Sequence, residues 1–313
     1  MKDIVYACND DYVEQTIISM VSLLKHNAYP IKFWIISDGI SEENRRLILE
    51  KTTGFEMPVE FVEIDSVLGG VSISDGDRHP LTVYAKLFLE NVISSDKVLY
   101  LDSDTVIDGD LSDLWERDMT DELVAGVQMP YSVKQKARMN ISSGSPYLCD
   151  GVVLLNLRYW RERKIGDRCK EYIVKEQGNP PMLSEGTLNY VCQNYIGVLP
   201  PDYNLMPSMI WYTGKQIRQL FKTDVYYQED ELQVARKRPV VVHYMNELYN
   251  RPWLVPCDHP YKQLYCGERQ ALFGTLPFRE QPLNRHTRMT RGLNATLPFV
   301  VFAGLYHIKH KDI

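Results

Sequence analysis

Two aspartates separated by a single residue follow an apolar stretch at residues 97–104, KVLYLDSD. The apolar part predicts a buried strand, and an extended backbone would place Asp102 and Asp104 on the same face. Open α/β sheets bind ligands beyond the carboxyl ends of their parallel strands. Two carboxylates at such an end suit a hard divalent cation that bridges to phosphate groups. The alternative is that Asp-x-Asp forms only a polar turn after the strand.

His243 offers a third metal ligand, because it follows the apolar run 240–242 and so stands at the end of another predicted strand. A lone histidine is also often a structural residue whose ring nitrogens are hydrogen-bonded to the protein. Beside an acidic pair that lacks a third protein ligand, we favour the metal role.

The elements that would position these residues alternate between strand and helix over the first hundred residues. Near-continuous apolar runs separated by helices indicate a parallel sheet with both faces covered. Ser41 is the predicted N-cap of one helix, because Glu42 and Glu43 fill its first turn. The predicted strands are 4–7, 31–36, 59–64 and 97–101, and the predicted helices are 12–25, a second one beginning after Ser41, and 81–92.

The second half is less regular, with predicted strands at 123–127, 151–155 and 239–242 and helices at 157–175 and 186–193. Loops rich in Gly, Pro and Ser at 66–80, 130–148 and 200–216 are typical of lids and binding walls. The alternation stops after about residue 270. We therefore predict a Rossmann-like α/β domain with a mostly parallel sheet at 1–271 and a C-terminal tail at 272–313.

The composition, 44% hydrophobic and 24% charged, is that of a soluble globular protein, and the net charge of -6 argues against a nucleic-acid partner. The six cysteines show no C-x-x-C spacing and no leader precedes the strand at 4–7. We therefore expect free thiols and a cytoplasmic protein. The tail surrounds the apolar run 298–302 with basic residues. This pattern indicates either peripheral contact with the inner face of an anionic membrane or packing on the main domain.

Taken together, these features resemble glycosyltransferase family 8, most closely its bacterial lipopolysaccharide galactosyl- and glucosyltransferases and more distantly glycogenin. The resemblance covers roughly residues 3–253, and it rests on the order and spacing of several blocks. It implies a GT-A type fold, a UDP-sugar donor carrying galactose or glucose, and a glycan, lipid-linked or protein acceptor. The blocks are DIVYA at 3–7, SDGIS at 37–41, YAKL at 84–87, the segment 97–104 with Leu114 and Trp115 downstream, GVVLLNL at 151–157, TLN at 187–189 and HY at 243–244.

In that family the two aspartates and a late histidine bind Mn²⁺, which implies that Asp102, Asp104 and His243 hold Mn²⁺ here, with Mg²⁺ as the alternative. The resemblance also implies a set of contacts to the donor. Residues 7–12, which follow the first strand, could instead form a helix-capping turn, and Lys86 could instead be a solvated lysine on a helix. The implied contacts are Ala7, Asn9, Asp11 and Tyr12 to uracil and ribose, Lys86 and Ser103 to the donor, and Arg251 to the diphosphate.

Two segments that contact the donor sugar in the family depart from its usual sequence. Residues 149–151 read Cys-Asp-Gly where Asn-Ala-Gly is usual, and residues 184–186 read Ser-Glu-Gly where Asp-Gln-Asp is usual. Cys149, Gly151 and Ser184 are nevertheless candidate contacts to the nucleotide sugar. The identity of the sugar does not transfer across such changes.

Family 8 enzymes retain the configuration of the anomeric carbon, which leaves two routes. In one, a carboxylate on the far face of the sugar is the nucleophile, as in retaining glycosidases, and Glu185 is the candidate. In the other, the acceptor attacks from the front face, the leaving phosphate accepts its proton, and Glu185 stabilises positive charge. Asp150 is a second carboxylate that would bind sugar hydroxyls. We favour the front-face route.

Two other functions are compatible with the same residues. A sugar nucleotidyltransferase also combines a parallel sheet with metal-binding carboxylates, but residues 7–10 lack the Gly-rich basic loop expected after its first strand. A non-catalytic module that binds a nucleotide sugar is left open by the altered segment 184–186.

Overall fold

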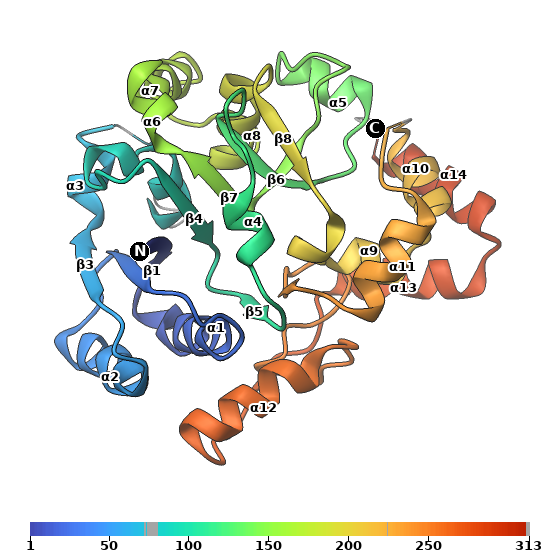
Figure 1. Ribbon diagram of the computed structural model, residues 1–313. Coiled ribbons are helices and arrows are strands. Elements are labelled where there is room, and N and C mark those ends of the chain that lie inside the picture. Colours follow the sequence, from blue (N-terminus) through green and yellow to red (C-terminus); the bar gives the residue numbers. More distant parts are fainter. Residues whose placement is uncertain (72, 74–80, 224, 311–313) are drawn as a thin grey trace.

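A seven-stranded sheet covered by helices on both faces forms the centre of the computed structural model, which describes residues 1–71, 73, 81–223 and 225–310 (Figure 1). The strand order is β3-β2-β1-β4-β7-β6-β8. Only β7 reverses direction, since it runs antiparallel to both β4 and β6. The strands are β1 (Lys2–Cys8), β2 (Ile31–Ser37), β3 (Val59–Glu63), β4 (Lys97–Leu101), β6 (Val124–Gln128), β7 (Leu148–Asn156) and β8 (Ile196–Leu199).

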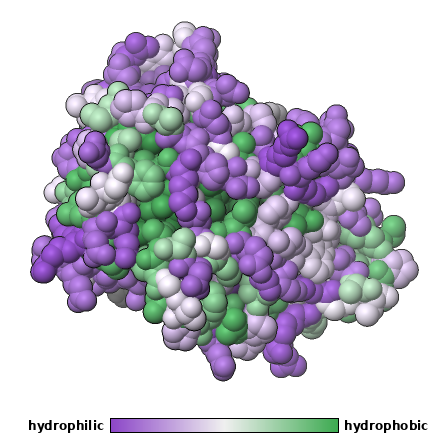
Figure 2. Space-filling view, turned by 60° about the horizontal axis from the view of Figure 1, so that its bottom comes forward, coloured by the Kyte–Doolittle hydropathy of each residue, from purple (hydrophilic) through white to green (hydrophobic). Residues whose placement is uncertain are grey.

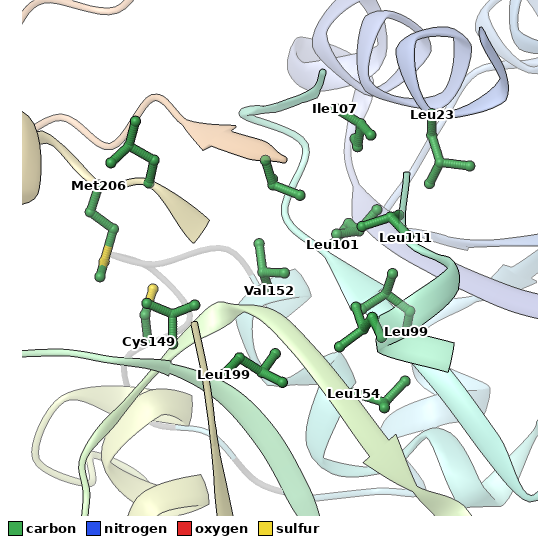
Figure 3. Packing of buried hydrophobic residues seen from close by; sticks show 14 of the residues in the cluster. Leu23, Leu99, Leu101, Ile107, Leu111, Cys149, Val152, Leu154, Leu199 and Met206 are labelled. Carbon is green, nitrogen blue, oxygen red and sulfur yellow. The ribbon is translucent and has the colours of Figure 1, made fainter. Parts of the chain in front are cut away.

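The central strands are mostly apolar because both faces of the sheet are buried. In β4, Leu99 and Leu101 point into one core, whereas Val98 and Tyr100 point into the other. Figure 3 shows the first core, to which Leu99 and Leu101 belong together with Leu23 of the first helix. The predicted α/β class with a mostly parallel sheet is therefore confirmed.

The helices divide between the two faces of the sheet. The first core lies against α1, α2 and α9 to α11, and the second lies against α3, α6, α7 and α8. The helices are α1 (Val13–His26), α2 (Glu42–Thr52), α3 (Ile64–Leu68), α4 (Ser112–Glu116), α5 (Val133–Arg138), α6 (Leu157–Glu162), α7 (Ile165–Lys175), α8 (Leu183–Cys192), α9 (Pro207–Trp211), α10 (Gly214–Phe221), α11 (Glu229–Lys237), α12 (Lys262–Phe273), α13 (Arg285–Thr296) and α14 (Phe299–Lys309).

Two of the predicted helices differ from the structure. The predicted helix 157–175 is wrong as a single element, because Lys164 adopts a left-handed backbone with φ 52° that separates α6 from α7. Hydrophobic periodicity does not register a break of this length. The predicted helix 81–92 consists of two 3₁₀ helices, Leu81–Leu87 and Leu89–Asn91. Ser41 caps α2 as predicted, since its hydroxyl accepts a hydrogen bond from the Asn44 amide.

The predicted loops contain short helices of their own. Residues 130–148 include α5, and residues 200–216 include the 3₁₀ helix Pro201–Asn204 together with α9. Most of the predicted loop 66–80 lies outside the described residues.

A second, two-stranded sheet lies below the carboxyl end of β4. It pairs β5 (Thr105–Ile107) with β9 (Val241–His243) in antiparallel register, and Thr105 lies opposite His243. This pairing brings a residue near the end of the domain beside the turn that follows β4.

The C-terminal tail packs on the rest of the chain at two places. β11 (Arg279–Glu280) pairs with β10 (Leu254–Val255), and Phe302 and Ala303 of α14 are buried in the first core. One side of α14 thus packs on the main domain, as one of the two interpretations of the tail expects. Within the described residues, no helix has the length and apolar character needed to cross a membrane.

Candidate functional site

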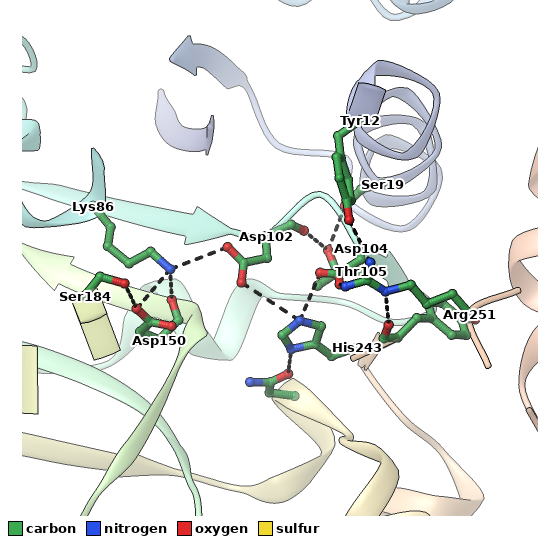
Figure 4. A network of polar contacts seen from close by, with 12 residues as sticks. Tyr12, Ser19, Lys86, Asp102, Asp104, Thr105, Asp150, Ser184, His243 and Arg251 are labelled. Atoms are coloured by element: carbon green, nitrogen blue, oxygen red, sulfur yellow. Dashed lines mark hydrogen bonds and ion pairs between the residues drawn. The ribbon is translucent and has the colours of Figure 1, made fainter. Parts of the chain in front are cut away.

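Asp102, Asp104 and His243 converge at the carboxyl end of β4. Each offers a ligand atom, and these atoms all lie within 4.8 Å of one another. His243 Nε2 is 3.0 Å from Asp104 Oδ1 and 3.9 Å from Asp102 Oδ2 (Figure 4). The two aspartates lie in the turn between β4 and β5. The segment is therefore a polar turn, as the alternative interpretation of the sequence held, and this turn also brings the two carboxylates close to His243.

Gly151 of β7 makes room for this cluster. A Cβ atom at this position would lie 2.4 Å from His243 Cε1 and 2.6 Å from Asp102 Oδ2, closer than carbon and oxygen atoms approach. The Gly151 carbonyl also accepts a hydrogen bond of 2.7 Å from the Asp102 amide. The glycine therefore lets the two ligands meet and fixes the backbone of one of them.

Asn204 orients the His243 ring, a role that the sequence gave no reason to expect. Its Oδ1 atom lies 3.0 Å from His243 Nδ1. An amide oxygen only accepts hydrogen bonds, so Nδ1 donates to Asn204. Nε2 lies 3.0 Å from Asp104 Oδ1 and donates to this carboxylate when the ring is protonated, and a bound cation would take the place of that proton. Histidine ligands of metals are held in this way by a second group. The two carboxylates suit a hard divalent cation such as Mn²⁺ or Mg²⁺.

The charges in the cluster depend on one another. Burial lowers the pKa of His243, but Asp104 raises it well above its ordinary value. Burial raises the pKa of Asp104, but His243 outweighs this effect and leaves the pKa low. Burial raises the pKa of Asp102, while Lys86 opposes the rise. A divalent cation in this cluster would compete with protons for the same atoms.

Lys86 connects the acidic cluster to a further carboxylate, that of Asp150. Its side chain is only 2% exposed, and its Nζ atom lies 3.1 Å from Asp150 Oδ2 and 3.5 Å from Asp102 Oδ1. It also donates a hydrogen bond of 3.0 Å to the Asp150 carbonyl. The alternative of a solvated helix lysine is therefore wrong. Ser184 completes the network by donating a 2.6 Å hydrogen bond to Asp150 Oδ2 (Figure 4).

Glu185 lies beside Asp150, but the contacts of the two carboxyl groups differ. Its Oε1 atom is buried and has no hydrogen-bond partner among the described residues. Burial, together with the charge of Asp150, raises the pKa of Glu185 to about 8. Tyr131 and Tyr147, whose stacked ring centroids are 3.9 Å apart, lie near Glu185. The sequence gave no indication of these two tyrosines.

A cleft of about 620 Å³ lies beyond the end of β1 and reaches the acidic cluster through Arg251. Arg251 Nη2 donates to Asp104 Oδ2 at 3.2 Å, and its Nη1 donates to the Tyr12 hydroxyl at 2.7 Å. Asp11 and Tyr12 line the cleft, together with Arg279 and Gln281 from the tail. Open sheets bind ligands at such a position, where the strand order reverses beside the first strand.

The comparisons with known proteins agree with this geometry. The sequence model of glycosyl transferase family 8 matches residues 3–256. The chain belongs to glycosyl transferase family 8. Among relatives, it is 23% identical over 269 residues to general stress protein A of Bacillus subtilis, covering 84% of this chain and 91% of that protein. It is 25% identical over 210 residues to a lipopolysaccharide 1,2-glucosyltransferase of Escherichia coli, covering 64% and 61% of the two chains.

The fold of this family 8 chain is also that of a solved galactosyltransferase. The structure of LgtC in complex with donor and acceptor sugar analogues is similar with a TM-score of 0.69 and 23% identity. The similarity covers 88% of this chain and 97% of LgtC. The resemblance to family 8 and to its lipopolysaccharide-type members is thus confirmed, and the GT-A type fold with it.

The structure places the other predicted residues of this family 8 site around the same sheet edge. Ala7 is buried near the end of β1, and the Oδ1 atom of Asn9, just after the strand, is buried without a partner among the described residues. Ser103 faces α1, where its hydroxyl accepts a 2.8 Å hydrogen bond from Thr16. Cys149 is buried close to His243. All six cysteines are free thiols, as predicted.

Proposed function

We propose that this family 8 protein transfers a hexose, galactose or glucose, from a UDP-sugar to a glycan, lipid-linked or protein acceptor with retention of configuration. Asp102, Asp104 and His243 would hold Mn²⁺, with Mg²⁺ as the alternative. The convergence of these three side chains at the end of β4 carries the proposal. The family membership and the fold support hexosyl transfer in general.

Arg251 supports a diphosphate position between the metal cluster and the cleft. Its guanidinium already bridges Asp104 and Tyr12, and a planar fork of this kind suits phosphate oxygens. A bound divalent cation would supply Lewis-acid neutralisation of the charge on the departing diphosphate. The uracil and ribose would then lie in the cleft beside Asn9, Asp11 and Tyr12, where Asn9 Oδ1 offers an unused acceptor.

The environment of Glu185 supports the front-face route over a covalent intermediate. A nucleophilic carboxylate must be ionised, whereas the raised pKa of Glu185, about 8, keeps it a neutral acid at neutral pH. Asp150 instead contacts Lys86 Nζ at 3.1 Å and accepts a hydrogen bond from Ser184. In this proposal Asp150 stabilises positive charge on the sugar, and the protonated Glu185 donates a hydrogen bond to the donor.

The test measures UDP release from a panel of nucleotide sugars with Mn²⁺, with Mg²⁺ and with a chelator. The Asp104→Asn variant is the matched control, because it keeps the shape of the side chain and removes its charge. Metal-dependent release of UDP from one sugar, lost in the variant, is the expected result.

Two other outcomes would contradict the proposal. Metal-dependent binding of a donor without turnover, even with acceptors supplied, would favour the non-catalytic binding module. Formation of a nucleotide sugar from a sugar phosphate would favour the nucleotidyltransferase, which membership of family 8 argues against. The proposal places the enzyme in the cytoplasm, a setting that agrees with its six free thiols.

A further inference from the structure

Helix α14 is apolar except for His307 and Lys309 in its last turn, but only one side packs on the protein. Phe302 and Ala303 are 2% and 1% exposed. On the other side, Val300 and Ile308 are each 70% exposed, and Val301 and Leu305 are 49% and 44% exposed. The remaining large hydrophobic side chains that reach the surface of the described chain lie singly or in small numbers on other elements. A stripe of four on one short helix is therefore a surface that lacks its partner.

The exposed stripe continues onto α13. Met289, which is 50% exposed, lines the same small hollow as Leu305 of α14. Figure 2 shows hydrophobic surface at the edge of the molecule where Figure 1 places these two helices. We call the surface formed by Met289, Val300, Val301, Leu305 and Ile308 the α13–α14 face.

Positive charge surrounds this face without any negative charge from the same segment. Between Glu280 and Lys311 the sequence contains no Asp or Glu, although the whole chain has a net charge of -6. Lys309 lines the hollow with Met289 and Leu305. Arg285 lies one turn before Met289 on α13 and so shares its side of the helix. Arg285, Arg288 and Lys309 form no ion pair within the described residues.

We propose that the α13–α14 face docks on an anionic lipid bilayer. The apolar side chains would enter the boundary between headgroups and acyl chains, while the neighbouring cations contact lipid phosphates. Helix α14 has 11 residues and is roughly 16 Å long, which is too short to cross a bilayer but sufficient to lie in its surface. The attachment is therefore peripheral.

Charge complementarity favours a bilayer over a second copy of the chain as the occupant. A symmetric dimer through this face would bring the same cations of two copies together, and like charges at an interface oppose association. An anionic surface neutralises them instead. The inference does not depend on the proposed sugar transfer, because vesicle binding is measured without donor, metal or acceptor.

The experiment measures co-sedimentation of the full chain with vesicles of phosphatidylcholine alone and of phosphatidylcholine mixed with phosphatidylglycerol. One variant carries Val301→Gln, Leu305→Gln and Ile308→Gln, which keep helix propensity and remove apolar surface. A second carries Arg285→Gln, Arg288→Gln and Lys309→Gln. The matched control carries Val174→Gln and Val234→Gln, because these valines are 59% and 60% exposed on the unrelated helices α7 and α11.

We expect the wild type and the control to bind the anionic vesicles, and the apolar variant to bind them at least about tenfold more weakly. The cation variant should lose the preference for anionic over neutral vesicles, and added salt should do the same to the wild type. Equal binding by wild type and apolar variant would overturn the inference. The inference would also be overturned if the wild type did not bind vesicles but formed a concentration-dependent dimer in light scattering, and the apolar variant did not form this dimer. Circular dichroism melts of each variant separate loss of binding from loss of folding.

Discussion

The two halves of the site are built in different ways. Asp102, Asp104 and His243, which we call the metal half after their proposed role, stand on strand ends whose positions are fixed by the register of two sheets. Asp150, Ser184 and Glu185, which we call the sugar half after their proposed role, lie on a strand and on the first turn of α8. The register of a strand fixes the position of each side chain along it, whereas the residue at which a helix begins can change with the local backbone conformation.

The start of α8 illustrates this difference. Met182 and Leu183 both have left-handed backbones, with φ 58° and 54°. Gly186 is required one turn later, since a Cβ atom there would lie 1.9 Å from the Pro181 carbonyl oxygen. Asn189 then fixes the helix to β7 through hydrogen bonds with both backbone groups of Leu148. The side chains at 184 and 185 are thus placed by several local constraints, and their chemistry can change while the frame stays the same.

Removing a charge from the metal half should have the largest effect. Asp104→Asn leaves the shape of the side chain but weakens its bond to a divalent cation, and we expect UDP release to fall about a thousandfold. Steady-state kinetics over a range of Mn²⁺ concentrations provides the measurement. A variant that kept wild-type activity in a chelator would show that this cluster holds no functional metal.

A methyl group in the metal half should have the next largest effect. Gly151→Ala would place a Cβ atom against His243 and Asp102, so that both ligands must move. We expect Mn²⁺ affinity and activity to fall about a hundredfold, because ligand geometry is disturbed without loss of any ligand. Gly144→Ala is the matched control, since a Cβ atom there meets nothing within 4 Å. Equal losses in both variants would mean that general destabilisation, rather than crowding at the ligands, is measured.

The support of the histidine should matter less than its ligation. Asn204→Leu removes the acceptor that holds the His243 ring, and we expect Mn²⁺ to bind about tenfold more weakly. Asn204→Asp keeps an acceptor at the same place and should bind Mn²⁺ better than the leucine variant. Titration with Mn²⁺, followed by electron paramagnetic resonance of the free ion, compares the two. Identical affinities would show that Asn204 does not orient the ring.

Much of the metal half could be predicted from the sequence because its signals are local. An apolar run followed by Asp102 and Asp104, and another followed by His243, each mark a strand end. Their convergence depends on β5 pairing with β9, which short apolar runs do not reveal by themselves. The family resemblance supplied that missing step. Asn204 was missed because a buried asparagine at the end of a short 3₁₀ helix carries no periodic signal.

The sugar half and the tail were less predictable for physical reasons. The direction of β7 was not foreseen, because a buried antiparallel strand has the same continuous apolar sequence as a parallel one. For Lys86 the sequence left a solvated helix lysine as the alternative to a donor contact, and only the fold shows it buried between Asp102 and Asp150. The apolar residues 298–302 supported two interpretations, and α14 has one buried side and one exposed side. Composition does not distinguish the sides of so apolar a helix.

The smallest effect at neutral pH is expected in the sugar half, where it also tests the route of transfer. Glu185→Gln replaces a group that is a neutral acid below about pH 8, the pKa to which burial and Asp150 raise it, by one that is neutral at every pH. We expect turnover near neutral pH to change by less than about threefold.

Above pH 8 the wild type should lose activity, because ionised Glu185 adds an anion beside Asp150, whereas the variant should keep it. The raised pKa in the folded state also means that ionisation destabilises the wild type as pH rises from the unfolded value toward 8, so the variant should gain relative thermal stability there. Rate profiles and melts against pH measure both effects. Loss of turnover at all pH values would contradict the expected small effect, and a glycosyl adduct on Glu185 in mass spectra of the wild type would identify this carboxylate as the nucleophile.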